Sequence, residues 1–539
     1  MVLATIPRRA GPLTEPVRRC VHACGVPHAS DIASSTTPGS PATPPAQPRR
    51  LALPGPDSLW WLAAVSAAFT ILQLIFFSLR TGLSWDEVVY VSQVSPHAHA
   101  AFFDPARSRG VPVLVAPVTL VTSSVAVLRG YLAVMSGLAL FGSLLAWRRL
   151  RPAWMLALAG VMFGGLWVTL YYAPQAMPDE WMAFAALAAV GMFARLAGPL
   201  SGEHGIPSPG PRARRWLLAG LVAVLASAGL MRIGDAMILA AVLAVAVLAL
   251  RPWRNWPLLA AIAGGAVLGA AEWVIEAYAR FGGPLRRLHL AGAEQGGIGV
   301  HLSGMWAELR ALNGPTLCRP CTIGWRYPEL SLWWLAIPVL VALGLLAARR
   351  AGRLSSALLA TVCAAAVGAP YLFGIDYAAP RFLLPSYALV AIPIADLLGA
   401  ILITARATRR RAITVVVAAG LALQVLSQLV VLTRQASGTA SFHRDYTRVA
   451  SELHALGVRP PCLVNGAQAI PVAFYAGCAS TPEGRGSHRP SLTAIGGSGR
   501  LVVLEWRHER PPAFAASWRR TVLTGTGHLR LVAYLPPGG

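Results

Sequence analysis

The 539-residue chain has a composition that excludes a soluble globular protein. Hydrophobic residues make up 55% of it and charged residues only 13%, and a water-soluble fold has no way to bury so much apolar surface, whereas a bilayer accepts it. The net charge of +24 would suit a nucleic-acid partner. However, the basic residues fall in short runs between apolar stretches, which indicates membrane topology instead. We therefore expect a polytopic membrane protein with no nucleic-acid partner.

The first segment, residues 1–57, is rich in Pro, Ser, Thr, Ala and Arg and has no apolar periodicity. This composition predicts a disordered tail, because such a segment cannot bury enough apolar surface to fold. We place the tail in the cytoplasm. Every basic residue of the chain is arginine, and Ala, Gly and Pro are abundant, which is typical of a high-GC bacterial genome and predicts a bacterial plasma membrane protein.

Residues 58–435 contain eleven apolar stretches that are long enough to cross a membrane. They are 59–79, 126–147, 153–173, 180–196, 215–231, 234–250, 257–279, 331–348, 354–374, 383–403 and 412–433. Residues 111–121 are apolar but too short to cross, and we expect a re-entrant or surface-lying helix there. Each predicted inner loop carries arginines, so the positive-inside rule places the N-terminus inside. The loops 80–125 and 280–330 and the C-terminal region then face outward.

The region 436–539 becomes soluble in character and predicts a small extracytoplasmic α/β domain. Its first part, His443 to Leu456, has the apolar spacing of an amphipathic helix. Four short apolar runs between Gly and Pro turns predict strands: 462–464, 472–475, 501–504 and 529–534. Glu505, His508 and Glu509 are interpreted as a solvated strand end.

Two cysteine pairs lie in regions placed outside the membrane. Cys318 and Cys321 belong to the 280–330 loop, and Cys462 and Cys478 to the C-terminal domain. An oxidising compartment permits disulfides, but the sequence leaves open whether either pair is bonded. The 280–330 loop also has a Gly-rich run, Gly292 to Gly299, that is compatible with a mobile lid or with a plain linker.

Two adjacent acids, Asp86 and Glu87, follow the first apolar span in a chain with only 22 acidic residues. Ionisable side chains beside apolar spans often mark function, because they are costly to keep near lipid. The alternative is that both acids cap an interfacial helix after Thr81 and Ser84. Both interpretations stay open at this point.

Four segments around these spans resemble a known superfamily. They are Asp86-Glu87-Val88-Val89-Tyr90, Arg109-Gly110-Val111-Pro112-Val113-Leu114, Tyr171-Tyr172-Ala173-Pro174 leading to Asp179, and Arg381-Phe382-Leu383-Leu384-Pro385. Together they resemble GT-C glycosyltransferases related to family 39, the protein O-mannosyltransferases and lipid A aminoarabinose transferases. The resemblance covers residues 55–435, and the spacing is better preserved than the letters. The family's Arg-Pro-Pro core is replaced by Arg-Gly-Val-Pro.

The resemblance implies an all-α GT-C-like membrane domain that transfers a hexosyl or pentosyl group on the outer face of the membrane. The donor would be a polyprenyl-phosphate sugar within the membrane lipid, and the acceptor a glycan, lipid or protein. Such a donor needs a cation for its phosphate, which arginine can bind bidentately. The acceptor needs a base, which a positioned carboxylate can supply.

These needs assign roles to the candidate residues. We predict Asp86 as the catalytic base and Glu87 as a supporting acid or helix cap. The predicted substrate-binding residues are Asp179, Arg109, Tyr90, Arg232 and Arg381. Blander roles stay open for several of them: Asp179 can cap its helix, Arg232 can pair with Asp235, and Arg109 can face lipid headgroups.

No cofactor or metal is expected, although Asp86 and Asp179 could hold a divalent ion. Two other classes of function stay open. A transporter or flippase would show an inverted repeat and polar residues within spans. We see no repeat, and Glu272 and Glu276 are nearly the only charges within spans. A non-catalytic assembly protein of the cell envelope would give no reason for acids to gather on the outer face.

Overall fold

The fold is described from a computed structural model. It describes residues 55–77, 79, 81–200, 209–297, 299–319, 321–322, 324–325, 327–481, 500–524 and 527–537. The predicted disordered tail, 1–57, lies outside the described residues apart from its last part, 55–57. Everything below concerns the compact unit Pro54–Gly539.

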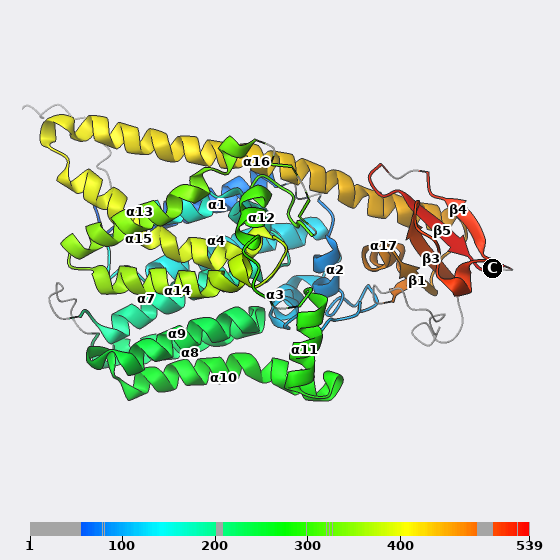
Figure 1. The fold of residues 1–539 in the computed structure, drawn as a ribbon, viewed down its shortest axis with the longest axis horizontal. Coiled ribbons are helices and arrows are strands. Elements are labelled where there is room, and N and C mark those ends of the chain that lie inside the picture. Colours follow the sequence, from blue (N-terminus) through cyan, green and yellow to red (C-terminus); the bar gives the residue numbers. More distant parts are fainter. Residues whose placement is uncertain are drawn as a thin grey trace, which may run out of the picture. The chain divides into compact units, whose positions relative to one another are not determined.

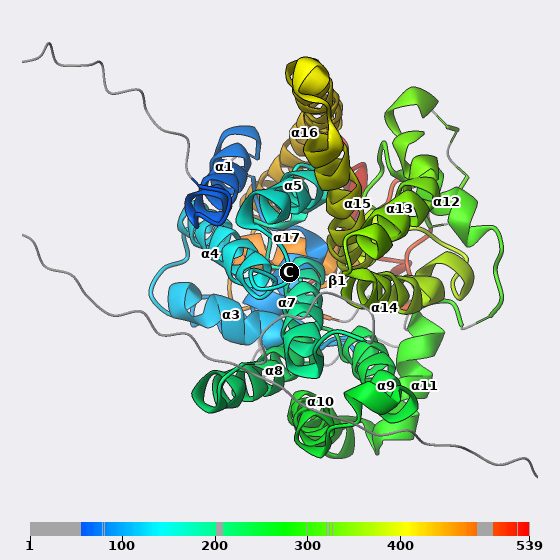
Figure 2. The ribbon, with the colours of Figure 1, turned by 90° about the vertical axis from the view of Figure 1, so that its left-hand side faces the viewer.

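Helices occupy all eleven positions at which the sequence predicts a span (Figure 1; Figure 2). They are α1 (Trp60–Phe76), α4 (Val125–Leu145), α5 with α6 (Ala153–Gly164 and Trp167–Tyr172), α7 (Asp179–Ala197), α8 (Pro211–Met231), α9 (Ile233–Ala249), α10 (Trp256–Glu276), α13 (Trp333–Arg350), α14 (Leu354–Phe373), α15 (Leu384–Thr404) and α16 (Ala407–Ala455). Among the described residues, eight helical segments are long and apolar enough to cross a membrane. The predicted all-α polytopic class is confirmed.

The remaining three predicted spans are shorter than expected. Helices α1 and α9 have 17 residues each. The predicted span 153–173 is broken, because α5 ends at the C-cap Gly165 and Leu166 takes an extended conformation with ψ 139° before α6 begins. At Gly165 an added Cβ would lie 2.6 Å from the carbonyl oxygen of Val161, so the chain turns where only glycine fits.

The apolar segment 111–121 is the ten-residue helix α3 (Gly110–Thr119), which is too short to cross a bilayer. The loop before it contains the short helix α2 (Trp85–Val91). The 280–330 loop contains α11 (Pro284–Glu294) and α12 (Gly304–Ala311). The sequence analysis did not predict these two helices, and the Gly-rich run that it left open begins in the last turn of α11.

Helix α16 is one continuous helix of 49 residues, and therefore roughly 70 Å long at 1.5 Å per residue. The sequence predicts a span over 412–433 and a separate amphipathic helix from His443, but the structure joins them. No proline interrupts the intervening polar stretch, so nothing in it stops the helix. Figure 1 shows α16 running from the helical bundle to the C-terminal sheet.

The C-terminal region forms a five-stranded mixed sheet in the order β2-β1-β3-β5-β4. Its strands are β1 (Cys462–Gly466), β2 (Ala479–Ser480), β3 (Arg500–Trp506), β4 (Arg519–Val522) and β5 (Leu531–Leu535). Strand β1 runs parallel to β2 and β3, whereas β5 is antiparallel to both β3 and β4. The predicted small α/β domain is confirmed.

Two expectations about this domain are wrong. Residues 472–475 are not a strand but lie in helix α17 (Ala469–Ala476), because the periodicity of a short buried apolar run does not distinguish the two. Glu505 is not at a solvated end, since it is only 5% exposed on the central strand β3. Both cysteine pairs that the sequence left open are disulfides, Cys318–Cys321 and Cys462–Cys478.

Candidate functional site

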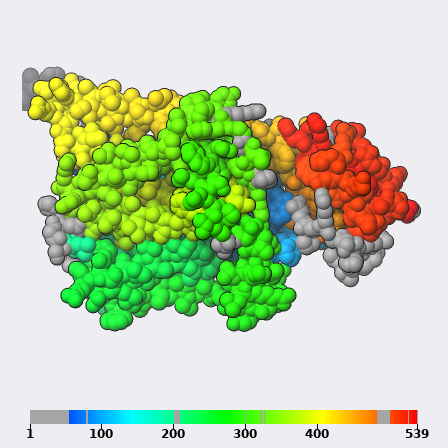
Figure 3. Space-filling view, viewed as in Figure 1, coloured from blue at the N-terminus to red at the C-terminus, as the bar shows by residue number. Residues whose placement is uncertain are grey.

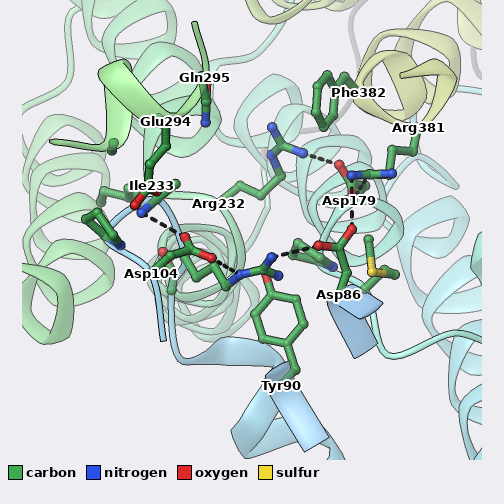
Figure 4. Close-up of a pocket in the computed structure, with 18 of the residues that line it drawn as sticks. Asp86, Tyr90, Asp104, Asp179, Arg232, Ile233, Glu294, Gln295, Arg381 and Phe382 are labelled. Carbon is green, nitrogen blue, oxygen red and sulfur yellow. Dashed lines mark hydrogen bonds and ion pairs between the residues drawn. The ribbon is translucent and has the colours of Figure 1, made fainter. Parts of the chain in front are cut away.

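A cavity of about 830 Å³ lies where the loops 80–125 and 280–330, several helix ends and the C-terminal domain meet. Its wall comes from α2, the segment 102–108, the junction of α8 and α9, helix α11, and Tyr371, Tyr377, Arg381 and Phe382. The C-terminal domain adds Gln468 and Ile470 to this wall. Figure 4 shows how carboxylates and guanidinium groups from these separate elements point toward one another.

Asp86 lies at the start of α2 and faces the cavity (Figure 4). Its Oδ1 accepts a hydrogen bond from Arg107 Nη2 at 2.7 Å, and its Oδ2 lies 3.3 Å from Arg381 Nη2. The side chain keeps 28% exposure. Burial raises the pKa of the Asp86 carboxyl, but Arg107 and Arg381 outweigh burial and hold the pKa below its usual value. Asp86 is therefore ionised at neutral pH.

A second group of charges continues from Asp86 through Arg381. Arg381 Nε lies 3.5 Å from Asp179 Oδ2, and Asp179 also pairs with Arg232. Arg232 in turn lies 2.9 Å from Asp235 and donates to the Tyr371 hydroxyl at 2.6 Å. In contrast to Asp86, Asp179 and Asp235 are 1% and 3% exposed. Asp86 is the most exposed carboxylate in this chain of ion pairs, and Asp104, which pairs with Arg107, follows at 15%.

Tyr90, one of the predicted substrate-binding residues, also lines the cavity, and its ring contacts Arg107. The guanidinium carbon of Arg107 lies 4.9 Å from the centre of the Tyr90 ring. The guanidinium nitrogens of Arg107 pair with both Asp104 and Asp86. Burial raises the pKa of the Tyr90 hydroxyl to about 12, so this group stays protonated at neutral pH.

Two of the predicted site residues are not among those that line the cavity. Glu87 is fully buried and pairs with Arg129, which is also fully buried. Its other contacts are backbone N–H groups: Ser84 N donates to Oε2 and Ala176 N to Oε1, each at 2.9 Å. Together with the Ser84 hydroxyl this forms a capping box at the start of α2. Glu87 thus has the helix-capping contacts that the sequence offered as one alternative.

Arg109 is the other residue outside the cavity lining. It lies 2.6 Å from Glu276 of α10 and donates to Gln93 Oε1 at 3.0 Å. Its guanidinium also lies 4.0 Å from the centre of the Phe103 ring. These contacts connect the start of α3 to the end of α10.

Sequence reasoning missed most of the cavity wall, including the charged residues Arg107, Glu294 and Arg319. Arg107 stands two positions before Arg109, and nothing in the sequence distinguishes which of the two faces the cavity. Arg319 had a usable signal, because it lies inside the Cys318–Cys321 disulfide loop. That loop is held against the cavity by a backbone bridge between Cys318 and Ala378. Glu294 is the last residue of α11.

The arginines of the cavity differ in how far their charge is neutralised. Arg107, Arg232 and Arg381 each contact two carboxylates. Arg319 is exposed, donates to the backbone carbonyl of Glu294 at 3.0 Å and lies 4.9 Å from the Tyr377 ring centre. Within the part of the chain that the structure describes, it forms no ion pair. Arg319 is therefore the cavity arginine with the most available charge.

The described residues contain no group of three or more His, Cys, Asp or Glu side chains that could hold a metal ion. Asp86 and Asp179, the two carboxylates considered for a divalent ion, are each paired with arginine instead. The lining residues therefore do not form a typical oxygen-ligand site for a divalent ion.

The chain has the fold of the GT-C membrane glycosyltransferases. The crystal structure of ArnT from Cupriavidus metallidurans bound to undecaprenyl phosphate aligns with 88% of this chain and 98% of its own length, with a TM-score of 0.59 and 15% identity. The apo structure of the same protein gives a TM-score of 0.59 at 14% identity, over 88% of this chain and 97% of ArnT. Neither a family model nor a curated protein sequence matches this chain.

Proposed function

We propose that this protein transfers a sugar from a polyprenyl-phosphate donor to an acceptor, with Asp86 as the general base. The observation that carries the proposal is the position of Asp86. It is an ionised carboxylate that opens into the cavity between two arginines and is the most exposed acid of its ion-pair chain, at 28% against 15% for Asp104 and 3% or less for Asp179 and Asp235. The likeness to ArnT, which has been solved with undecaprenyl phosphate, supports a lipid-phosphate donor.

The cavity suits the reacting head of such a donor. A volume of about 830 Å³ falls within the usual range for small-molecule sites, and it can hold a sugar phosphate with part of an acceptor. Part of the wall, formed by Met231, Trp273 and Leu288, is apolar. We propose that the lipid tail leaves the cavity past this wall, because it needs an apolar path into the bilayer.

The proposed reaction is a single displacement at the anomeric carbon. The acceptor O–H or N–H loses its proton to Asp86 as its oxygen or nitrogen bonds to that carbon. The bond from the anomeric carbon to the phosphate oxygen breaks, and polyprenyl phosphate leaves with the electron pair. One displacement inverts the anomeric configuration. A positioned general base contributes about 10²–10⁴-fold to the rate.

The arginines around Asp86 supply the positive charge that the leaving phosphate needs. Arg107 and Arg381 already lie at Asp86, so they are adjacent to the reacting atoms. We assign the first contact with the donor phosphate to Arg319, because its charge is not used by a carboxylate among the described residues. Arginine binds phosphate oxygens through charge-assisted hydrogen bonds.

We further propose that the cavity faces the outer side of the membrane, with the N-terminus in the cytoplasm. The arginine-rich loops predicted inside support this orientation. The Cys318–Cys321 disulfide next to the cavity supports it as well, because disulfides persist in oxidising compartments. Protease accessibility of a C-terminal tag in intact cells and in inverted vesicles tests this orientation.

The decisive experiment uses the full chain in lipid nanodiscs with a panel of labelled polyprenyl-phosphate sugars and an envelope extract as acceptor source. Release of free polyprenyl phosphate is measured for the wild type, Asp86→Asn and Asp376→Asn. Asp376 is the matched control, since it is an exposed loop acid that is not among the cavity-lining residues. We expect Asp86→Asn to lower release from the preferred donor by about 10²–10⁴-fold and Asp376→Asn to leave it unchanged. Release that survives in the folded Asp86→Asn variant overturns the assignment of Asp86 as the base. No release from any donor overturns the assignment of transferase activity.

A further inference from the structure

The C-terminal domain contacts the peptide that leads directly into Asp86. The backbone N–H of Leu83 donates to the Tyr475 hydroxyl at 2.6 Å. His443 Nδ1 lies 2.7 Å from the carbonyl oxygen of Gly82. Because a carbonyl oxygen only accepts, the Nδ1 atom carries the proton and donates it. In Figure 3 the blue surface of the early chain meets the orange surface of the C-terminal part.

Both side chains belong to helices. Tyr475 is on α17 and His443 is on α16, the helix that continues without a break from the membrane bundle. The rings of His443, Tyr446 and Tyr475 stack in sequence, with centroid distances of 5.8 Å and 6.4 Å. The Tyr446 hydroxyl donates to Gln468 Oε1 at 2.8 Å, and Gln468 lines the cavity. The stack therefore connects the cavity wall to the two contacts on residues 82–83.

The contact at Gly82 leaves no room for a side chain. An added Cβ would lie 2.7 Å from the Tyr475 hydroxyl oxygen and 3.3 Å from His443 Cβ. The Gly82 carbonyl also accepts from Arg129 Nη2 at 2.9 Å. One peptide is thus held from two sides, by the membrane bundle through Arg129 and by the C-terminal domain through His443 and Tyr475.

The distance along the chain from this peptide to Asp86 is short. Ser84 is the N-cap of α2, the helix begins at Trp85, and Asp86 follows. A shift of residues 82–83 therefore moves the cap and the carboxylate together. Reacting groups need to be held within about 0.5 Å of their productive geometry, and a misplacement of about 1 Å can cost 10²-fold in rate.

From these contacts we propose that the C-terminal domain positions the catalytic base. His443 and Tyr475 form a clamp, defined here as these two side chains with their hydrogen bonds to Gly82 and Leu83. The clamp touches no reacting atom and acts through Asp86, so both members are positioning residues. This inference rests on the proposed function of Asp86.

The first test measures kcat and donor KM separately for clamp variants of the full chain in nanodiscs. Tyr475→Phe removes the acceptor for Leu83 N–H, and we expect kcat to fall about 2- to 10-fold, the rate equivalent of one hydrogen bond, with KM unchanged. Tyr534→Phe is the matched control, because it makes the same change on β5 of the same domain, outside the cavity lining. It should change neither constant.

His443 offers a rescue test. His443→Ala removes the donor to Gly82, whereas His443→Asn restores a nitrogen donor at nearly the same distance from the backbone. We expect the alanine variant to lose kcat about 2- to 10-fold and the asparagine variant to recover most of it. Equal kcat in His443→Ala and wild type overturns the clamp. Should Tyr475→Phe fail to fold, this pair carries the test alone.

A double-mutant cycle separates positioning from general stability. In the Asp86→Asn background the base is already gone, so Tyr475→Phe should lower the residual rate no further. A loss of the same size in both backgrounds overturns the proposal. The two failures are distinguishable: an active Asp86→Asn variant refutes the proposed function, whereas an inactive one beside a fully active Tyr475→Phe refutes only the clamp.

Discussion

Two neighbouring residues of the sequence, Asp86 and Glu87, belong to different regions: Asp86 to the open ion pairs of the cavity, and Glu87 to a sealed ion pair with Arg129. Asp86 lies in the cavity with 28% of its side chain exposed, whereas Glu87 and its partner Arg129 are fully buried. Successive residues of an α-helix point about 100° apart, so α2 turns one carboxylate to the cavity and the next to the bundle. Asp86 and Glu87 are adjacent in sequence and therefore lie in different surroundings, where they can have different roles.

The two regions also differ in what their ion pairs contribute. A sealed pair has lost its water, so its net contribution to stability is small or negative, but removal of one partner leaves the other charge buried alone. Glu87 has every contact that such a site requires, with Arg129 and two backbone N–H donors. The Asp86 pairs border open space, where a substrate can exchange with them. We therefore expect the Glu87–Arg129 pair to matter for the stability of the fold and the Asp86 pairs to matter for the reaction.

The largest effect on the fold is expected at the sealed pair. Glu87→Gln leaves Arg129 without a counter-charge, and we expect the free energy of unfolding to fall by about 3–5 kcal/mol, measured by denaturant unfolding in detergent. Asp86→Asn, at a site with greater exposure, is the control and should lose much less. Comparable losses in the two variants would contradict the contrast between the regions.

The same pair predicts the pH dependence of stability. Burial raises the pKa of Glu87, but Arg129 and the backbone donors outweigh it, so the pKa in the folded protein lies below the ordinary 4.5. Its stabilising contribution is therefore fully present above about pH 4.5 and is lost as the pH falls through the lower folded value. Glu87→Gln should remove this part of the acid sensitivity.

A smaller effect is expected at Arg319, the cavity arginine whose charge is most available. Arg319→Gln should raise the donor KM about 10-fold with little change in kcat, the loss expected for one charge-assisted hydrogen bond. Arg310→Gln is the matched control, because Arg310 is an exposed residue of α12 outside the cavity lining. An unchanged KM would show that the neutralised arginines already suffice for the phosphate.

Much of the membrane part could be predicted from sequence, because apolar runs of bilayer length and arginines in the loops have few alternative explanations. The broken span at Gly165 and the continuous α16 could not, since each depends on local backbone geometry rather than on hydropathy. In the site, Asp86, Tyr90, Asp179, Arg232 and Arg381 are brought to one cavity.

The remaining site residues could not be predicted, because their place in the site depends on side-chain direction and on contacts between distant parts of the chain. Arg107 rather than Arg109 reaches Asp86, and two arginines two positions apart give no sequence signal for which one turns inward. Gln468 and the clamp residues lie more than 350 positions from Gly82 along the chain. No local pattern can report such a contact.

A still smaller effect is expected at Tyr90, whose ring supports Arg107 at 4.9 Å. Its pKa, raised by burial to about 12, leaves the hydroxyl protonated, so it does not serve as a base. Tyr90→Phe keeps the ring and should retain at least half of the wild-type kcat. Tyr90→Leu loses the cation–π contact, and kcat should fall a few-fold, since such contacts contribute roughly 0.5–2 kcal/mol. A large loss in Tyr90→Phe would instead assign the hydroxyl a direct role.

The smallest predicted effect concerns Glu294, an acid of the cavity wall that changes charge near neutral pH. Burial, with a further contribution from Asp104, raises the pKa of Glu294 to about 7. Glu294 lines the same cavity as Arg319, so its charge acts within the proposed donor site. A polyprenyl-phosphate sugar is a phosphodiester and keeps one negative charge throughout this range. As the pH rises from 6 to 8, Glu294 ionises and repels the donor phosphate. The donor KM should therefore rise about two- to fivefold, as expected for a screened pair of charges.

The pKa of Asp86 is lowered, so kcat should stay constant over the same pH interval. Glu294→Gln should make the KM flat as well; a slope that persists in this variant would place the titrating group elsewhere in the cavity.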